Sequence, residues 1–390
     1  MKKTFDEVVL FARTGLNPRQ NFKLGQGKNK YITIKNIKNN TLVVDDNTDV
    51  VDDDAIKLIH KRSQIKKGDI LFASIGRMGD MYIIEKEPVG WDINESVFAF
   101  TLNTNIVRQK YFYYIFKVKS TLDYLASNSS GSTFKSIKMN QLKRMVFDIP
   151  SLKEQDSIIT ILDKVCNVIE MRKRELGSLD ELIKARFVEL FGDPIKNPKG
   201  WEVVTIGDIV TEVRYGTSKP AVEGGKYPYL RMNNLTVDGH LDLKDLKYID
   251  IPDDEMEKCV VRKGDVLFNR TNSIELVGKT AVFDLPEDMV IAGYIIRVRL
   301  NERLLPEIFS QYMNLEALKD ILRAMAKGAV NQANINAQEL QSIKVYVPDM
   351  EVQKQFIKMK AQVDKSKVAI QAALDKSQLL FDSLMQKYFG

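Results

Sequence analysis

The chain contains one unit twice, and this repeat constrains its fold more than any other feature. Four landmark segments recur in the second half at offsets of 196 to 198 residues. They are Tyr31–Ile37, Lys67–Phe72, Ile149-Pro150 and Phe191-Gly192, which return as Tyr229–Leu235, Lys263–Phe268, Val347-Pro348 and Phe389-Gly390. Solenoid repeats have periods of about 20–50 residues, so this period is too long for them. The sequence therefore predicts two whole modules in tandem, which can present two similar surfaces to two different targets.

The rear part of each module carries a long amphipathic pattern. Mostly apolar side chains alternate at spacings of four and three, which indicates a coiled-coil seam. The seam positions are Ile158, Leu162, Val165, Ile169, Arg172, Leu176, Leu179, Ile183, Arg186 and Leu190, then Phe356, Lys360, Val363, Lys367, Ile370, Leu374, Ser377, Phe381, Leu384 and Tyr388. Ser151 with Glu154 predicts a capping box for the first helix, and Asp349 can cap the second.

Each predicted helix spans roughly 36 residues, or about 50 Å, and so long an apolar stripe needs a partner. A whole domain connects the two helices, so they can pair antiparallel within the chain and act as a rigid ruler with one domain near each end. Packing of each helix on its own domain, or dimerisation through the stripe, are the alternatives. The predicted fold class is α+β. Two mixed α/β domains at 1–150 and 193–348 are separated by an antiparallel two-helix coiled coil from 151–192 and 349–390, as a pseudo-twofold internal repeat.

Within the mixed domains, short β-like runs alternate with turns. The runs are Ile70–Ser74, Met81–Ile84, Val97–Leu102, Val266–Phe268 and Ile295–Leu300. The Lys-Gly-Asp before two of them suits a turn, because glycine tolerates a positive φ. One helix is predicted in each domain, at about 108–126 and 305–326. A Gly-led polar loop, a short helix and a final strand before the Pro complete each domain.

Composition favours recognition over catalysis. Residues 1–192 carry 31 Lys and Arg against 24 Asp and Glu, whereas residues 193–390 carry 27 against 28. This modest basic excess permits binding of a polyanion without establishing it. The chain has only two histidines, His60 and His240, and neither lies in a zinc-binding or nucleophile-activating pattern. No catalytic, cofactor-binding or metal-binding residue is therefore predicted.

Two further features bear on chemistry and location. The acidic group of Asp45, Asp46, Asp49 and Asp52–Asp54 lacks the spacing of a calcium loop and is interpreted as an exposed loop. Two unpaired cysteines, Cys166 and Cys259, fit a reducing compartment. With no apolar run long enough to span a membrane and no signal peptide, the sequence predicts a cytoplasmic protein.

Polar segments in both domains are rich in side chains that read nucleic-acid bases and phosphates. Arginine can fork onto guanine, and asparagine or glutamine onto adenine. The candidates in the first domain are Arg13, Thr14, Asn17, Arg19, Lys35, Asn36, Ser74, Arg77, Ser132 and Lys135. Those in the second are Arg214, Tyr215, Thr217, Lys219, Arg231, Asn233, Asn234, Arg270, Asn272, Tyr294, Asn331 and Gln332. Many of these segments occur at matching places in the two copies, which strengthens the prediction.

Taken together, the landmarks resemble those of the specificity subunit of a Type I restriction-modification system. The resemblance covers the whole chain and rests on the two-module layout, the Lys-Gly-Asp-x-Leu-Phe turns, the Phe-Gly ends and Tyr229–Leu235. It also rests on a strand-Pro-x-x-x-x-Gln entry into each long helix, ending at Gln155 and Gln353. The first copy departs from the pattern at Thr33–Asn36, which lacks the arginine of the second, and this puts its base contacts in doubt.

The resemblance implies two target-recognition domains, each reading one half of a split site in double-stranded DNA. The helix pair would set the gap between the half-sites. It also implies two methyltransferase subunits and restriction subunits as partners, so that S-adenosylmethionine, ATP and Mg²⁺ would belong to those partners and this chain would not be catalytic by itself. The alternatives are a DNA-binding scaffold or regulator without a methyltransferase, a nuclease whose site the sequence hides, and a pair of RNA- or peptide-binding modules.

Overall fold

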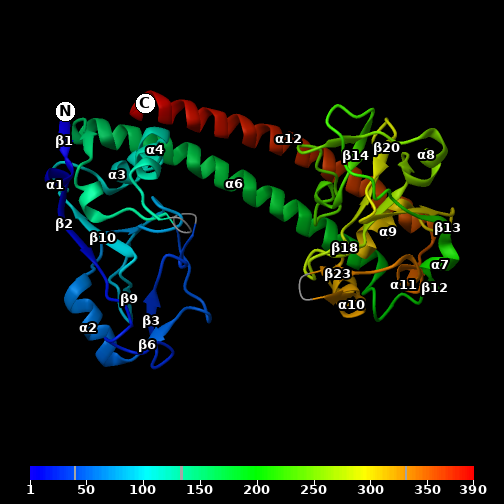
Figure 1. Cartoon of the computed structure of the whole chain (residues 1–390), viewed down its shortest axis with the longest axis horizontal. Coiled ribbons are helices and arrows are strands. Elements are labelled where there is room, and N and C mark those ends of the chain that lie inside the picture. Colours follow the sequence, from blue (N-terminus) through cyan, green and yellow to red (C-terminus); the bar gives the residue numbers. More distant parts are fainter. Residues whose placement is uncertain (39–40, 132–134, 330–331) are drawn as a thin grey trace. The chain divides into compact units, whose positions relative to one another are not determined.

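The chain forms two compact units (Figure 1). The computed structural model describes residues 1–38, 41–131, 135–329 and 332–390. Unit 1 consists of residues 1–172 with 373–390, and unit 2 of residues 173–372. Each unit therefore contains one mixed domain, half of the long helix that follows it and half of the other long helix.

The elements appear in nearly the same order in both domains. The first domain has β1 Lys2–Thr4, α1 Phe5–Val8, β2 Val9–Thr14, β3 Asn29–Ile32, β4 Ile37–Lys38, β5 Thr41–Leu42, β6 Val50–Val51, α2 Asp53–Ser63, β7 Ile70–Ala73, β8 Met81–Ile83, β9 Trp91–Ile93, β10 Val97–Leu102, α3 Gln109–Ile115, α4 Lys119–Ser127, α5 Met139–Leu142 and β11 Val146–Asp148, before α6 Leu152–Phe191. The second has β12 Glu202–Thr205, α7 Ile206–Ile209, β13 Val210–Tyr215, β14 Tyr227–Leu230, the 3₁₀ turn η1 Met232–Asn234, β15 Lys247–Ile249, α8 Asp253–Cys259, β16 Val260–Val261, β17 Val266–Asn269, β18 Thr271–Asn272, β19 Thr280–Val282, β20 Met289–Ile291, β21 Ile295–Leu300, α9 Pro306–Met313, α10 Glu316–Met325, β22 Lys327–Ala329, β23 Gln332–Asn334, α11 Ala337–Gln341 and β24 Lys344–Val347, before α12 Met350–Phe389.

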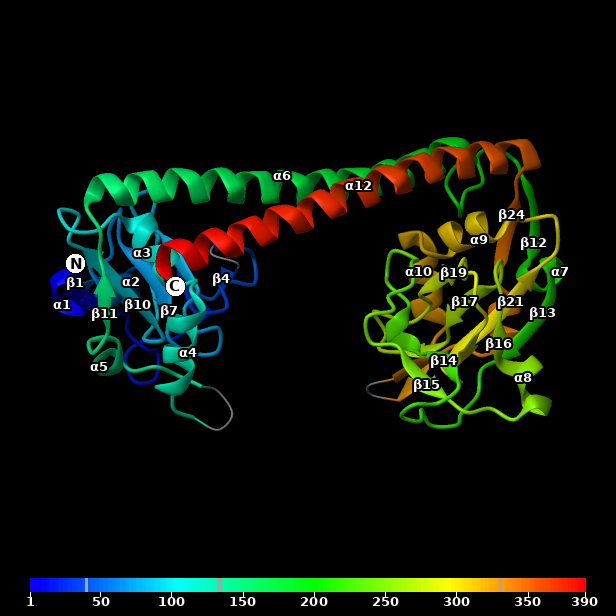
Figure 2. The same ribbon diagram turned by 90° about the horizontal axis from the view of Figure 1, so that it is seen from above.

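The central antiparallel sheet has the same strand order in the two domains; Figure 2 labels β7 and β10 of the first sheet and β13, β17, β19 and β21 of the second. Its strand order is β2-β10-β7-β8 in the first and β13-β21-β17-β19 in the second. A second sheet in each domain contains one parallel pair, β3 with β9 and β14 with β20. The predicted repeat is therefore a repeat of strand topology as well as of sequence landmarks.

Burial on both faces of the central sheet explains its continuous apolar runs. Successive side chains of a strand point to opposite faces. In β7, Ile70 and Phe72 enter one apolar cluster and Leu71 enters another. In β17, Val266 and Phe268 lie on one side and Leu267 on the other. A strand buried on both faces cannot show the polar alternation of a half-exposed one.

The Lys-Gly-Asp turn before each of these strands has the predicted glycine conformation. Gly68 and Gly264 have φ of 88° and 95°, which disfavours any residue with a Cβ. Each aspartate carboxylate also accepts a hydrogen bond from a backbone N–H three residues earlier, at 3.1 Å for Asp69 and 2.9 Å for Asp265. Glycine and aspartate thus hold the same turn in both copies.

Two predictions about helices are wrong. The single helix expected near 108–126 is two helices, α3 and α4, and that near 305–326 is α9 and α10. In the second domain Asn314 occupies the break, and its side chain donates to the Thr280 carbonyl at 2.6 Å and accepts from Lys319 at 2.8 Å. The long-range bond to Thr280 and the local bond from Lys319 fix a turn that an apolar periodicity does not reveal.

The acidic group is only partly a loop. Asp52 caps α2 by accepting hydrogen bonds from the N–H groups of Asp54 and Ala55, and Asp53 and Asp54 lie in its first turn. Carboxylates are favourable there because they offset the positive end of the helix dipole. The exposed-loop interpretation is therefore wrong for these three residues, and α2 was not predicted.

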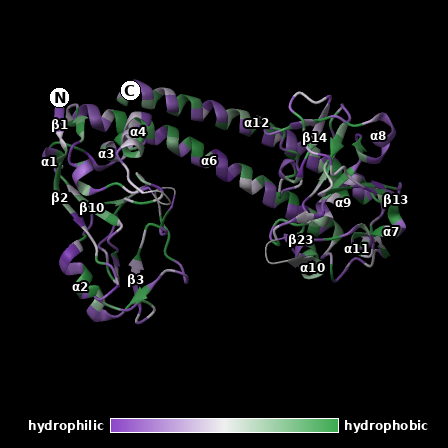
Figure 3. Ribbon diagram, viewed as in Figure 1, coloured by the Kyte–Doolittle hydropathy of each residue, from purple (hydrophilic) through white to green (hydrophobic). Residues whose placement is uncertain are grey.

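The two long helices contact each other within each unit, as the seam predicts. Every predicted seam position is buried or half-buried, and hydropathy alternates along both ribbons (Figure 3). In unit 1, Leu162 of α6 and Met385 of α12 belong to one apolar cluster with Tyr114 and Val118 of the domain. In unit 2, the ring of Phe356 lies 5.2 Å from that of Phe187. Each end of the pair therefore packs on a domain as well as on the other helix.

Polar residues in the seam are paired. In unit 1, Arg172 donates hydrogen bonds to the Ala373 carbonyl and to the Ser377 hydroxyl. In unit 2, the Lys367 ammonium forms an ion pair with Asp180 at 2.5 Å. The bonds of Arg172 and Lys367 compensate the polar groups that interrupt the apolar stripe.

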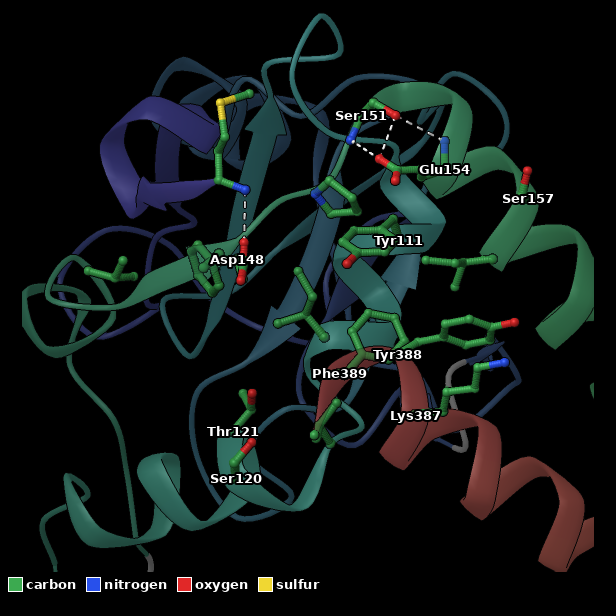
Figure 4. Close-up of a pocket in the computed structure, with 18 of the residues that line it drawn as sticks. Tyr111, Ser120, Thr121, Asp148, Ser151, Glu154, Ser157, Lys387, Tyr388 and Phe389 are labelled. Carbon is green, nitrogen blue, oxygen red and sulfur yellow. Dashed lines mark hydrogen bonds and ion pairs between the residues drawn. The ribbon is translucent and has the colours of Figure 1, made fainter.

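The predicted capping box of Ser151 and Glu154 is present at the start of α6 (Figure 4).

A buried glutamine fastens each domain to the first turn of its long helix. Gln155 accepts from Arg108 N–H at 2.8 Å and donates to the carbonyls of Ile106 and Pro150 at 2.8 and 2.9 Å. Gln353 accepts from Leu305 N–H at 2.9 Å and donates to the carbonyls of Arg303 and Pro348 at 3.0 and 2.8 Å. Both side chains are fully buried. This clamp is the physical reason for the Pro-x-x-x-x-Gln landmark.

Replacement of Gln353 by methionine should destabilise unit 2 strongly. The substitution keeps the volume but leaves one buried N–H and two carbonyls without partners, at a cost of about 1–3 kcal/mol for each group. Thermal unfolding followed by circular dichroism measures the loss. Gln355→Met, an exposed position of the same helix, is the control and should change stability by less than about 0.5 kcal/mol. Equal melting temperatures for the two variants would contradict the clamp.

Candidate nucleic-acid interface

In unit 2 the predicted segments gather around the connection between β20 and β21. Gly216 lets the backbone of residues 214–219 lie close to the end of β20, because a Cβ at Gly216 would lie 2.1 Å from the Ile291 carbonyl oxygen. Thr217 N–H donates to the same carbonyl at 2.9 Å, and Gly293 N–H donates to the Thr217 carbonyl at 2.7 Å. Arg270 N–H donates to the Tyr294 carbonyl at 3.0 Å. Segments 214–219 and 270–272 are thus held on either side of residues 292–294.

Two exposed tyrosines and one arginine form the centre of this surface. The Arg270 guanidinium lies 5.0 Å from the centroid of the Tyr215 ring, and the Tyr215 hydroxyl accepts from Ala337 N–H at 2.8 Å. Among the described residues no acceptor contacts the buried Arg270 Nε. Tyr215 and Tyr294 remain 42% and 48% exposed. A guanidinium placed over an aromatic ring keeps its N–H groups available for bidentate contacts with a base edge or a phosphate.

Amide side chains lie beside this centre. β18 pairs with β23, which sets Asn272 opposite Ala333, the neighbour of the exposed Gln332. Asn272 donates to the side-chain oxygen of Asn269 at 2.7 Å. Asn269, which was not predicted, is fully buried and donates to the carbonyls of Thr271 and Tyr294. In the sequence, the position of Asn269 at the end of an apolar strand could have indicated that its side chain holds the neighbouring segments together.

The remaining basic candidates of unit 2 are ion-paired. Arg214 pairs with Glu212 at 3.0 Å, Lys219 with Glu255 at 2.8 Å and Arg231 with Asp245 at 2.8 Å. These pairs are exposed or half-buried, and such pairs contribute little to stability. The three cations can therefore exchange their carboxylate partners for phosphates at small cost.

Two carboxylates on this surface, those of Glu212 and Asp245, have a lowered pKa. Burial would raise the pKa of Glu212, but the hydrogen bond from Arg214 and the charges of Arg297 and Arg299 outweigh it and lower the pKa. The hydrogen bond from Arg231 is the main cause that lowers the pKa of Asp245. The surface is thus a mixture of fixed positive and negative groups rather than a uniform basic patch.

The two adjacent asparagines of the second landmark have different surroundings. Asn233 is exposed, whereas Asn234 is 2% exposed. Asn234 accepts from Arg231 N–H at 2.8 Å and donates to the Asp242 carbonyl at 2.8 Å. Asn36 does the same in unit 1, accepting from Thr33 N–H at 2.9 Å and donating to the Val43 carbonyl at 3.0 Å. The landmark asparagine therefore braces the turn after the parallel strand in both copies.

In unit 1 several candidates are engaged inside the protein. Arg13 forms an ion pair with the buried Asp69 at 2.7 Å and also donates to the Gln64 carbonyl. Thr14 donates to the Glu95 carbonyl, and the buried Ser74 donates to the Ser96 carbonyl, both at 2.8 Å. Thr14 and Ser74 thus lie at the connection between β9 and β10, the counterpart of residues 292–294, whereas the Arg13 side chain is turned toward Asp69 and Gln64.

Other candidates of unit 1 are more accessible. Arg19, Lys35, Arg77 and Lys135 are exposed, and Asn17 is half-buried. A bridge between Ile75 and Ser136 brings Arg77 near Lys135, whose carbonyl accepts from Gly76 N–H at 3.1 Å. Ser132 and, in unit 2, Asn331 lie outside the described residues.

Among the residues that the structure describes, no group of three or more His, Cys, Asp or Glu side chains could hold a metal ion. The described helices likewise include none that is long and apolar enough to cross a membrane.

The chain belongs to the family of the Type I restriction modification DNA specificity domain, whose sequence profile matches residues 1–180 and again residues 198–377. It is similar to the putative type I restriction enzyme MjaX specificity subunit of Methanocaldococcus jannaschii, with 31% identity over 171 residues, 43% of this chain and 40% of that protein. It is also similar to the EcoKI specificity subunit of Escherichia coli, with 24% identity over 255 residues, 61% of this chain and 55% of that protein. The chain spans about half the length of the curated relatives it matches.

Solved structures agree with the fold. The S subunit of a Type I restriction-modification system from M. genitalium superposes with a TM-score of 0.56 at 17% identity, covering 100% of this chain and 96% of that one. A chain from a study of complex assembly and conformational transition of the type I R-M system gives 0.59 at 18% identity, with coverage of 100% and 97%. The predicted family, and the fold class of two mixed domains with an antiparallel helix pair, are confirmed.

Replacement of Asn234 by alanine should lower the stability of unit 2, because Arg231 N–H and the Asp242 carbonyl lose their partner. The expected cost is about 1–3 kcal/mol, measured by thermal or denaturant unfolding. Asn233→Ala, one residue earlier and exposed, is the matched control and should leave stability nearly unchanged. If Asn233→Ala destabilised the protein as much as Asn234→Ala, the assignment of the brace would be wrong.

Proposed function

We propose that this chain is the sequence-reading subunit of a Type I restriction-modification enzyme and is not catalytic by itself. Each domain would read one half of a bipartite site in double-stranded DNA. The observation that carries the proposal is the presence of two copies of one recognition module in a chain of this family, each fastened to the same helix pair by a buried glutamine. A single reading module would have no use for a shared connector.

The surface around residues 292–294 supports base reading by unit 2. It combines an arginine over a tyrosine ring, exposed tyrosines and exposed amides, which are groups that contact base edges and phosphates in a major groove. In unit 1 the exposed Arg19, Lys35, Arg77 and Lys135 are the corresponding candidates. The two domains would read different sequences, because the side chains at corresponding places differ.

Partners would supply the chemistry. Two methyltransferase subunits would bind this chain and carry S-adenosylmethionine, and restriction subunits would bring ATP and Mg²⁺, all in the cytoplasm. Co-purification of the tagged chain with a methyltransferase, and mapping of methylated sites in a host that carries both, test the assignment. A bipartite methylated motif that disappears when this chain is deleted is the expected result. Duplex DNA binding without a methyltransferase partner would instead favour a regulator or scaffold.

Replacement of Arg231 by alanine should relax discrimination at one base pair by roughly 1–3 kcal/mol. Arginine can form a bidentate contact with guanine that alanine cannot replace. Binding to duplexes substituted one position at a time measures the effect. Arg303→Ala is the control, because Arg303 is also ion-paired, with Glu202 at 2.6 Å, but lies outside the gathered segments. Uniform weakening on all sequences would identify Arg231 as a phosphate contact.

Insertion of seven residues into both long helices should lengthen the spacer of the target and leave the half-sites unchanged. Seven residues keep the seam in phase and add about 10.5 Å, or about three base pairs. The insertions belong after Arg172 in α6 and after Ala372 in α12, where the two units meet in sequence. Methylation mapping reads out the spacer. Insertion into α6 alone is the control, since it breaks the register, and an unchanged spacer in the double insertion would contradict the ruler.

A further inference from the structure

Arg270 of unit 2 and Ser74 of unit 1 occupy corresponding places in the internal repeat. Arg270 N–H donates to the Tyr294 carbonyl at 3.0 Å, as Ser74 N–H donates to the Ser96 carbonyl at 3.1 Å. The carbonyl of each of the two residues also accepts from an isoleucine N–H at 2.9 Å. The backbone hydrogen bonds are therefore the same in both copies, and the side chain is what differs.

This difference changes what the place can bind. In unit 1 the Ser74 hydroxyl is buried and donates to the Ser96 carbonyl at 2.8 Å, so it is used inside the protein. In unit 2 the Arg270 side chain is half-buried. Among the described residues its guanidinium has neither a hydrogen-bond acceptor nor an ion-pair partner. Arg270 thus has N–H donors that the folded chain leaves unused.

The other basic candidates of unit 2 are already paired. Arg214, Lys219 and Arg231 each form an ion pair with a carboxylate, at 2.8 to 3.0 Å. Arg270 can accept a ligand without breaking such a pair. A half-buried cation without a counter-charge also has a desolvation cost, which acceptor atoms of a ligand would reduce.

The Arg270 side chain is held in place by its neighbours. Its guanidinium lies over the Tyr215 ring, 5.0 Å from the centroid, and the Tyr215 hydroxyl accepts from Ala337 N–H at 2.8 Å. The fully buried Asn269 donates to the Tyr294 carbonyl at 3.1 Å, which supports the backbone beside Arg270. A guanidinium on so rigid a support presents its N–H groups in one orientation and loses little side-chain entropy on binding.

We propose that Arg270 is the residue with which unit 2 reads a guanine, by donating two N–H groups to O6 and N7 in the major groove. Guanine presents two acceptors at this edge, which match the fork of a guanidinium, whereas adenine presents one acceptor and one donor. Unit 1, with Ser74 at the corresponding place, has no such fork. This inference rests on the proposed function and names the base at one position of one half-site.

The base analogue 7-deazaguanine tests the assignment, because it keeps O6 but has a C–H group in place of N7. The full chain with the proposed methyltransferase subunits is titrated with duplexes in which each guanine of the target is replaced in turn. Affinity should fall by about tenfold at one position of one half-site, as for the loss of a hydrogen bond to a charged group. Arg270→Ala should bind the natural duplex about tenfold or more weakly and should no longer respond to 7-deazaguanine at that position.

Arg323→Ala is the matched control. Arg323 is also half-buried in unit 2, but it pairs with Glu316 at 2.6 Å and lies outside the gathered segments, so its replacement should keep the response to 7-deazaguanine. Replacements in the other half-site should affect Arg270→Ala and the unaltered chain alike, which shows that the variant is folded.

Three results would overturn the proposal. They are a response of Arg270→Ala that equals that of the unaltered chain, a uniform weakening of Arg270→Ala on all duplexes, which indicates a phosphate contact, and a target in which no guanine is sensitive to the replacement. Absence of any sequence-specific binding by the unaltered complex would refute the proposed function, and this inference with it.

Discussion

The packing of the two long helices on each other is the interaction on which the rest of the structure depends. A 40-residue amphipathic helix exposes an apolar stripe that is unfavourable in water, and each helix covers the stripe of the other. Because the helices are antiparallel, each unit contains the start of one and the end of the other. Unit 1 is therefore complete only when residues 373–390 pack on residues 1–172. Closing a loop over such a sequence separation has an entropic cost, and the burial of the apolar seam offsets it.

The buried glutamines convert this pair of helices into a support for the domains. The hydrogen bonds of a buried amide are directional. Three such bonds from one side chain fix the orientation of the first turn of the helix relative to the preceding loop and proline. Apolar packing alone would allow small rotations at this junction. A binding site carried by a domain depends on such definition, since a specific contact depends on the position of a side chain to within a fraction of an ångström.

The two domains present different side chains on one framework. The braced turns at Asn36 and Asn234 and the glycine turns before β7 and β17 are the same in both. Around them the side chains differ. Arg13 is bound to a buried carboxylate in unit 1, whereas its counterpart Arg214 is exposed and pairs with Glu212 in unit 2. Cations that pair with surface carboxylates must exchange partners on binding a polyanion, which makes affinity sensitive to salt.

The sequence by itself determined the tandem repeat, the central strands, the two long helices, their seam and the family, because each has a local pattern or a landmark that recurs at a constant offset. Only the tertiary structure decided how the polar side chains are used. Asn233 and Asn234 are the same type of residue, yet the side chain of Asn233 is exposed, whereas that of Asn234 is buried and braces a turn by donating to the Asp242 carbonyl. The break at Asn314 and the pairing of Arg13 with Asp69 likewise depend on partners distant in sequence. A periodicity shows which side chains turn inward, but the partner of a polar group is a property of the folded chain, so the roles of individual asparagines and arginines required the structure.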